Sequence, residues 1–263
     1  MFKSYENWLI EVRDNIAILK INRVEHKNSL SVQTIQELDS ILDEIEQNSE
    51  IKAFVITAEG RVFGIGAHIP EILLSDDAEK AKKLSAAGQK IFSRITAIGK
   101  PSCAAINGIF CLGGSFELAL SCTLRVASKR CRLGLPEVSL GVIPGYGGTQ
   151  LLPKIVGMGR ANEMILTGIP IKAEDALNYG ILNAVCDANE EIDTAIALLD
   201  KVLNNGPLAV KKAMGLIKDS FEMSLAEGLE AEGCGFAELR GTADANEGLT
   251  ANQENRKAEF NNQ

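Results

Sequence analysis

The chain has 263 residues, a net charge of −8 and a hydrophobic fraction of 46%. This length suits one large domain or one domain with a smaller appendage, and the hydrophobic fraction is enough for a sizeable core. The acidic balance argues against nucleic acid as a partner. No uncharged run supplies the ~20 apolar residues that cross a bilayer, so we expect no membrane association through a spanning segment.

In chain order, the hydrophobic pattern of the first half predicts a strand at 15–21, a helix at 31–47, a strand at 52–57, a helix at 78–98, a strand at 102–106, a helix from about Gly113 and a strand at 123–127. Ser31 is a plausible N-cap of the first helix. A glycine-rich loop over 60–66 follows the second strand. Strands that alternate with helices in this way argue for parallel βαβ units.

After Tyr146 the pattern becomes mostly helical, with helices expected at 150–156, 161–166, 173–179, 190–203, 208–221 and 224–239 and a polar helical stretch at 242–260. We therefore expect an α/β core over residues 1–200 and a helical C-terminal region over residues 201–263.

The numbers and positions of the cysteines and histidines limit the kinds of metal and catalytic site that the chain can form. None of the six cysteines forms a CxxC pair, and most stand among apolar residues, which is typical of reduced thiols in a cytoplasmic protein. The two histidines, His26 and His68, are too few for a three-histidine zinc site and give poor support for a Ser-His-Asp triad, so we expect no metal. The first residues do not read as a secretory signal, nor the last as a peroxisomal signal, and we expect a cytoplasmic location.

The segment LGGSFELALSC contains Glu117, the one charged residue between Pro101 and Leu124. If a helix starts at Gly113-Gly114, its first N–H groups lack intrahelical partners and favour negative charge. A glycine pair that allows the helix and a strand to pack closely is the competing explanation for the same segment. Glu117 is costly to bury unpaired, so an exposed or salt-bridged side chain is the competing interpretation.

A second glutamate, Glu137, stands among apolar residues in LGLPEVSLGVIPGYGGTQ. Pro136 followed by Glu137 also fits an ordinary helix start. Glu137 lies twenty residues after Glu117, so only the tertiary fold can bring the two together. Two carboxyl groups in one apolar site would shift each other's titration, as acid/base chemistry requires. The loop FGIGAHI follows a strand and offers free backbone N–H donors. A loop without any binding role could have the same sequence.

Together these segments resemble the enoyl-CoA hydratase/isomerase family, the crotonases, over about residues 15–260. The resemblance is carried, in the family's order and spacing, by NRVEHKNSLS, VFGIGAHI, NGIFCLGGSFELALSC, LGLPEVSLGVIPGYGGTQLL and VGMGRANEMILTG. It implies an α/β fold, a crotonase-like spiral of ββα units with a helical C-terminal region that takes part in oligomerisation and site closure. It also implies homotrimers that pair into hexamers.

The resemblance further implies that a thioester carbonyl binds between the N–H groups of Ala67 and Gly114. Fixed donors of this kind stabilise the enolate, and losing one typically costs ~3 kcal/mol. As in family hydratases, Glu117 would deprotonate and orient a water that attacks Cβ, while Glu137 supplies a proton to Cα; an exchange of these roles stays open. No metal or redox cofactor is implied, because coenzyme A belongs to the acyl-CoA substrate.

The substrate-binding residues that the resemblance implies are Lys27, Gly66, His68, Ile69, Gly113 and Gly145. The walls of the acyl pocket are expected from 73–84, Phe92, Phe110 and the region after Tyr146.

The sequence departs from the family pattern at three places. His68 takes the usual aspartate position of the loop, and Glu25 takes a usual lysine position, for which Lys27 could substitute. Asn252 and Asn255 stand where many relatives have an aromatic residue and a lysine, which leaves Arg256 or Lys257 to meet a phosphate.

The departures leave an acyl-carrier-protein thioester open beside a CoA ester. A Δ3,Δ2-enoyl isomerase and a non-catalytic thioester-binding protein are the competing functions. The presence of both glutamates favours the hydratase over each.

Overall fold

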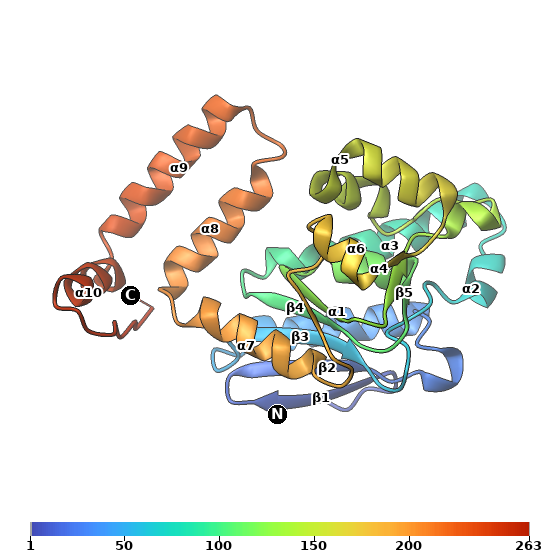
Figure 1. The fold of residues 1–263 in the computed structure, drawn as a ribbon, viewed down its shortest axis with the longest axis horizontal. Helices are drawn as coiled ribbons and strands as arrows, with labels where there is room; N and C mark the ends of the chain where they lie inside the picture. Colours follow the sequence, from blue (N-terminus) through green and yellow to red (C-terminus); the bar gives the residue numbers. More distant parts are fainter. Residues whose placement is uncertain (1, 263) are drawn as a thin grey trace. The chain divides into compact units, whose positions relative to one another are not determined.

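The computed structural model of the chain describes residues 2–262 (Figure 1). The main sheet has the order β1-β2-β3-β4-β6-β9, and a smaller sheet has the order β5-β7-β8. The strands are β1 (Trp8–Arg13), β2 (Ile16–Ile21), β3 (Ala53–Ala58), β4 (Ser102–Ile106), β5 (Phe110–Leu112), β6 (Leu124–Ser128), β7 (Arg132–Gly134), β8 (Ile171–Lys172) and β9 (Ala184–Cys186). From β2 to β9 every pairing in the main sheet is parallel, and only β1 runs antiparallel to its neighbour.

The helices are α1 (Val32–Gln47), α2 (Ile69–Leu73), α3 (Ala78–Ala97), α4 (Gly114–Leu120), α5 (Gly148–Thr167), α6 (Ala173–Asn178), α7 (Glu191–Leu203), α8 (Pro207–Asp219), α9 (Leu225–Arg240) and α10 (Ala243–Gln253). Two single 3-10 turns, η1 (Val24–His26) and η2 (Glu137–Leu140), interrupt the loops. α5 contains a break at Gly157, which has φ 75°, so it corresponds to the two helices predicted there.

The core lies between the parallel sheet and the helices that cover it. All residues of β3 and β4 are buried, which explains why their sequences are mostly apolar. α1 turns its apolar stripe, including Ile35, Leu38 and Ile41, into this core. Its N-cap is Ser31, as predicted, because the hydroxyl accepts a hydrogen bond from the N–H of Thr34. The sheet thus holds the loops after β3 and β4 in fixed positions, and those loops build the site.

The predicted strands and helices of the first half are confirmed to within one or two residues. The strands that the pattern did not indicate are short or half-exposed: β5, β7, β8 and β9 have two or three residues each. β1 is half-exposed and lies at the edge of the sheet, where charged residues are tolerated. Such strands lack a hydrophobic period long enough to recognise.

The chain forms two compact units, with the boundary between Ala197 and Leu198, inside α7. In the second unit α8 and α9 lie side by side (Figure 1). The helix predicted to reach Phe260 is too long, because α10 ends at Gln253. Asn255 adopts φ 52°, and the N–H of Arg256 donates to the carbonyl of Ala251, a typical left-handed helix ending.

The cysteines follow the expectation with one exception. Cys103, Cys111, Cys122 and Cys131 are buried, Cys186 is half-buried and Cys234 is exposed on α9. Burial raises the pKa of the Cys131 thiol to about 12, which keeps that thiol protonated and unreactive. Within residues 2–262, no helix has the length and apolar character needed to span a bilayer.

Candidate active site

The loop after β3 and the start of α4 approach each other through glycine backbone. The carbonyl of Gly66 accepts from the N–H of Leu30, and the N–H of His68 donates to the carbonyl of Leu30, which fixes the loop beside α1. A Cβ added to Gly66 would lie 3.4 Å from the nitrogen of Gly114, and one added to Gly113 would lie 3.3 Å from Cα of Gly66. Gly66 and Gly113 also have positive φ values of 99° and 54°, so glycine is needed for both reasons.

Two backbone N–H groups are free at this contact. Gly114 is the first residue of α4, where an N–H has no intrahelical acceptor. Across residues 2–262, neither the N–H of Gly114 nor that of Ala67 donates to a protein group. A Cβ added to Gly114 would lie 3.4 Å from the nitrogen of Ala67, so the two donors are close neighbours. This arrangement favours an oxygen that carries or develops negative charge.

Glu117 is buried one turn further along α4, with 1% of its surface exposed. The N–H groups of Tyr146 and Gly148 donate to its Oε1 at 2.8 and 2.7 Å. It has no ion pair with any other described residue, so the interpretation as an exposed or salt-bridged glutamate is wrong. Burial raises the pKa of the Glu117 carboxyl group to about 7. The neighbouring Glu137 also raises this pKa, whereas the hydrogen bonds from backbone N–H groups lower it.

Glu137 reaches the same place from η2, and the Pro136–Glu137 start of a helical turn is confirmed. A Cβ added to Gly113 would lie 3.0 Å from its Oε1. Its Oε2 is buried and has no hydrogen-bond partner in the part of the chain that the structure describes. Burial raises the pKa of this carboxyl group too. The fold therefore brings together two glutamates twenty residues apart, around the Gly113–Gly114 peptide and the two free N–H groups.

The raised pKa of Glu117 predicts a pH-dependent stability. The ordinary value is 4.5 and the folded value about 7, so the folded state binds more protons between them. The stabilisation is complete below pH 4.5 and is lost as the pH rises through 7, with a decrease in unfolding free energy of ~3 kcal/mol. We expect Glu117→Gln to remove this part of the slope. Urea unfolding from pH 5 to 8 for both proteins measures it, and parallel curves would contradict it.

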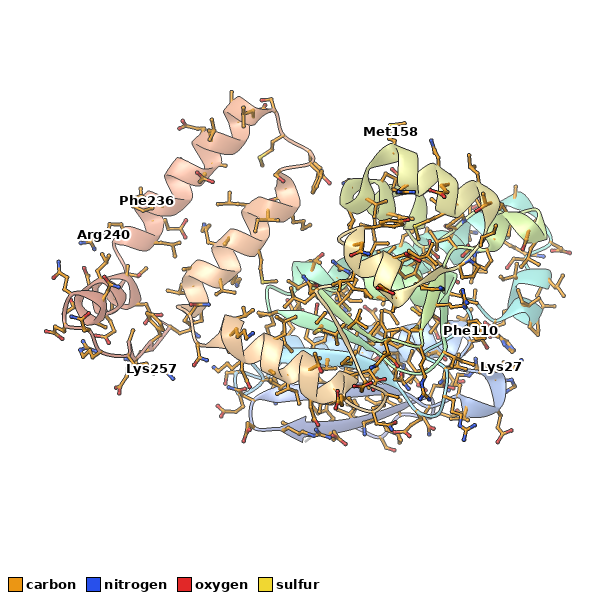
Figure 2. The ribbon with its side chains drawn as sticks, viewed as in Figure 1. Lys27, Phe110, Met158, Phe236, Arg240 and Lys257 are labelled. Carbon is orange, nitrogen blue, oxygen red and sulfur yellow. The ribbon has the colours of Figure 1, made fainter. Side chains whose placement is uncertain are left out.

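The other predicted binding residues lie around this centre. Gly145 is half-buried in the loop that also supplies Tyr146, and Ile69 begins α2 and is 48% exposed. Nδ1 of His68 lies 3.1 Å from the hydroxyl of Ser29, and its ring meets that of His26 edge-on at 5.3 Å. Lys27 is exposed just after η1, at the surface of the first unit (Figure 2).

In the second unit, the cations considered for phosphate contact have protein partners. Arg256 forms ion pairs with Glu247 at 2.6 Å and with Glu254 at 2.7 Å. The ammonium group of Lys257, labelled in Figure 2, donates to the side-chain carbonyl of Asn204 at 3.1 Å. A phosphate would therefore have to compete with carboxylates for Arg256.

Sequence reasoning missed the groups that hold the site in shape. The hydroxyl of Ser115, fully buried on α4, accepts from the N–H of Gly66 at 3.1 Å and so ties the loop to the helix. The peptide donors to Glu117 were missed as well. The available signal was the glycine run of IPGYGG, since a Cβ on Gly148 would lie 3.0 Å from Oε1 of Glu117.

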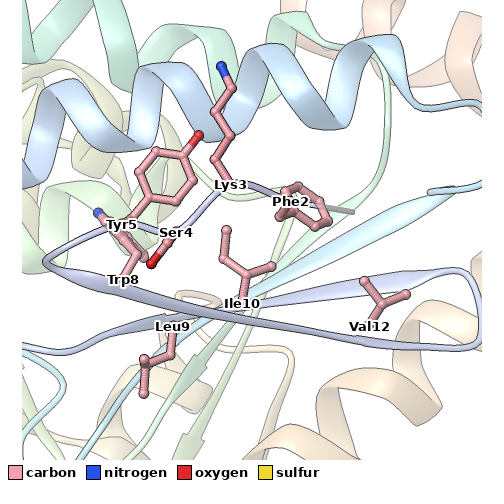
Figure 3. Close-up of a pocket in the computed structure, with 8 residues that line it drawn as sticks. All are labelled: Phe2, Lys3, Ser4, Tyr5, Trp8, Leu9, Ile10 and Val12. Carbon is pink, nitrogen blue, oxygen red and sulfur yellow. The ribbon is translucent and has the colours of Figure 1, made fainter.

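A separate pocket of about 310 Å³ lies between the N-terminal segment and β1 (Figure 3). Eight residues between Phe2 and Val12 line it, and none belongs to the site around Glu117. It brings no pair of acids or nucleophiles together. Over residues 2–262, no group of three or more histidine, cysteine or acidic side chains is arranged to hold a metal.

Comparison with known proteins gives a consistent result. Residues 11–263 match the family model described as enoyl-CoA hydratase/isomerase. A short-chain-enoyl-CoA hydratase of Clostridium acetobutylicum is 39% identical over 254 residues, covering 96% of this chain and 97% of the relative. A crotonyl-CoA hydratase of Syntrophomonas wolfei is 34% identical over 258 residues, covering 98% of each.

The fold comparison agrees. The crystal structure of an enoyl-CoA hydratase from Bacillus anthracis superposes with a TM-score of 0.92 at 32% identity, over 98% of this chain and 100% of that one. The architecture is thus the crotonase fold that the sequence motifs predicted. The match of family model, relatives and fold over nearly the whole length shows that the chain belongs to the enoyl-CoA hydratase/isomerase family.

Proposed function

We propose that the protein is a hydro-lyase, an enoyl-CoA hydratase that adds water reversibly across the 2,3 double bond of a 2-enoyl-CoA thioester to give a 3-hydroxyacyl thioester. The observation that carries this is the placement of two acids, Glu117 and Glu137, around a peptide segment whose N–H group is free beside that of Ala67. The relatives named above are hydratases, which supports hydration over the Δ3,Δ2-isomerase alternative.

Each group has one task in this proposal. The N–H groups of Ala67 and Gly114 donate to the thioester oxygen and stabilise the charge that develops there as an enolate. Glu117, ionised, accepts a proton from water while the water oxygen bonds to Cβ. Glu137, protonated, gives a proton to Cα. Burial raises the pKa of both carboxyl groups, as suits residues that exchange protons during a reaction.

The remaining predicted residues bind substrate in the same proposal. Gly66 and Gly113 allow the thioester to approach the backbone, and Gly145 shapes the pocket beside the two acids. Lys27 and Ile69 are exposed and His68 is half-buried, and in this proposal the three residues contact the coenzyme A part. The conjugated thioester carbonyl itself makes Cβ electrophilic and delocalises the charge that develops at Cα, so the reaction requires no further cofactor.

Assembly and location complete the proposal. The second unit exposes large apolar side chains, including Leu225 on α9 at 80% and Phe236 at 72%, the latter labelled in Figure 2. We assign this surface to a homotrimer, alone or paired into a hexamer, with the region from residue 201 onward contributing to site closure. Light scattering should give the mass of three or six chains. The buried thiols suit a cytoplasmic protein.

The first test is an assay for hydration of crotonyl thioesters. The loss of the conjugated enoyl absorbance monitors the reaction, and mass spectrometry identifies the product. We expect turnover of crotonyl-CoA with water added. Vinylacetyl-CoA, which an isomerase would convert, serves as the comparison substrate. Turnover of the carrier-protein ester alone would contradict the CoA assignment, and conversion of vinylacetyl-CoA alone would contradict hydration.

A further inference from the structure

The ring of Tyr146 is set between two glycines. A Cβ added to Gly88 of α3 would lie 2.4 Å from its Cδ1, and one added to Gly114 of α4 would lie 3.0 Å from its Cδ2. The two edges of the ring therefore contact backbone that has no side chain. The ring of Phe92 meets it at 5.5 Å with an angle of 72° between planes, and only 7% of Tyr146 is exposed. The ring has one tightly defined position.

The backbone that carries this ring is also held by α3. The hydroxyl of Ser85 donates to the carbonyl of Gly145 at 2.5 Å, and the side-chain amide of Gln89 donates to the same oxygen at 2.9 Å. Ser85, Gly88 and Gln89 have the i, i+3, i+4 spacing that places residues on one helix face. One face of α3 thus fixes both Gly145 and the ring that follows it.

The ring stands next to the reacting groups. A Cβ added to Gly114 would point toward the ring of Tyr146. The same Cβ would lie 3.4 Å from the nitrogen of Ala67. The N–H of Tyr146 itself donates to Oε1 of Glu117. The position proposed for the thioester carbonyl therefore lies beside this ring.

The hydroxyl group of Tyr146 has no hydrogen-bond partner among residues 2–262. Burial and the carboxylates of Glu117 and Glu71 raise the pKa of this phenol to about 12, so it is neutral. Within the described chain the side chain therefore contributes through its volume and not through a hydrogen bond.

We propose that Tyr146, held in the recess at Gly88, limits the length of the acyl chain and restricts the enzyme to short 2-enoyl thioesters. This inference rests on the proposed hydratase function, since it uses the binding position of the thioester in that reaction. The residue determines specificity by occupying the space into which a longer chain would extend.

The test compares the full-length wild type with Tyr146→Ala, Tyr146→Leu and Tyr146→Phe on crotonyl-CoA and 2-octenoyl-CoA. We expect Tyr146→Ala to raise the octenoyl-to-crotonyl ratio of kcat/KM about 10- to 100-fold, as space for methylene groups does in hydrophobic pockets. Tyr146→Phe keeps the ring and should keep the wild-type ratio. An unchanged ratio in the alanine variant would overturn the proposal, and Tyr146→Leu provides the same test if that variant does not fold.

Binding of saturated thioesters separates this inference from the proposed reaction. Calorimetry with butyryl-CoA and octanoyl-CoA measures the pocket without turnover, and octanoyl-CoA should gain affinity over butyryl-CoA in Tyr146→Ala alone. If the wild-type protein hydrates no enoyl-CoA but Tyr146→Ala shows this shift in affinity, the proposed function is refuted and the pocket limit is kept. In the recess itself, Gly88→Ala should weaken crotonyl turnover, and adding Tyr146→Ala should relieve the defect; additive losses would count against the recess.

Discussion

Replacement of Glu117 by glutamine is expected to lower kcat/KM for crotonyl-CoA hydration by about 10³-fold, within the range typical of a lost general base. An amide cannot accept the proton of the attacking water. It has nearly the same shape, and its oxygen can still accept from the N–H groups of Tyr146 and Gly148. The loss should therefore appear in the rate and not in the fold, as measured by steady-state kinetics and thermal unfolding.

Glu137→Gln is the companion variant and should show a loss of about 10²-fold or more, because the proposed proton donor to Cα is removed. Glu163→Gln serves as the matched control, since Glu163 is an exposed glutamate paired with Arg160 on α5. It should retain wild-type kinetics. If Glu137→Gln alone is impaired, isomerisation becomes the better account, and if both variants are fully active the candidate site is wrong.

Gly114→Ala should lower kcat/KM for crotonyl-CoA by about 10²- to 10³-fold, the range associated with loss of an oxyanion donor. The new methyl group would lie 3.4 Å from the nitrogen of Ala67 and 3.0 Å from the ring of Tyr146. It would therefore occupy the space beside the two free N–H groups, which is the proposed position of the thioester oxygen. The N–H of residue 114 remains, so the defect comes from blocked access.

Gly159→Ala is the control for this substitution. Gly159 lies in α5 with no heavy atom within 4 Å of the added Cβ, so alanine should leave activity unchanged. Near wild-type turnover of crotonyl-CoA by Gly114→Ala would exclude the proposed position of the carbonyl.

Local sequence patterns determined much of the fold. The period of α1, the N-cap at Ser31 and the apolar runs of β3 and β4 depend on burial and hydrogen bonding within a few residues, so each could be predicted from its own letters. The short strands β5, β7, β8 and β9 could not, because two or three residues show no period. The end of α10 was also missed, since it depends on the left-handed conformation of one residue, Asn255.

The sequence by itself supplied the candidate groups of the site: the glycine loop with Ala67, the helix start at Gly114 and the two glutamates. Only the tertiary structure decided that Glu117 is buried without an ion pair and that Glu137 lies beside Gly113. It also revealed the two peptide donors to Glu117 and the recess for Tyr146 at Gly88. The hydrophobic pattern of a segment shows which face of its helix or strand is buried. The contacts of the site join distant segments, and their approach depends on how the sheet places its loops.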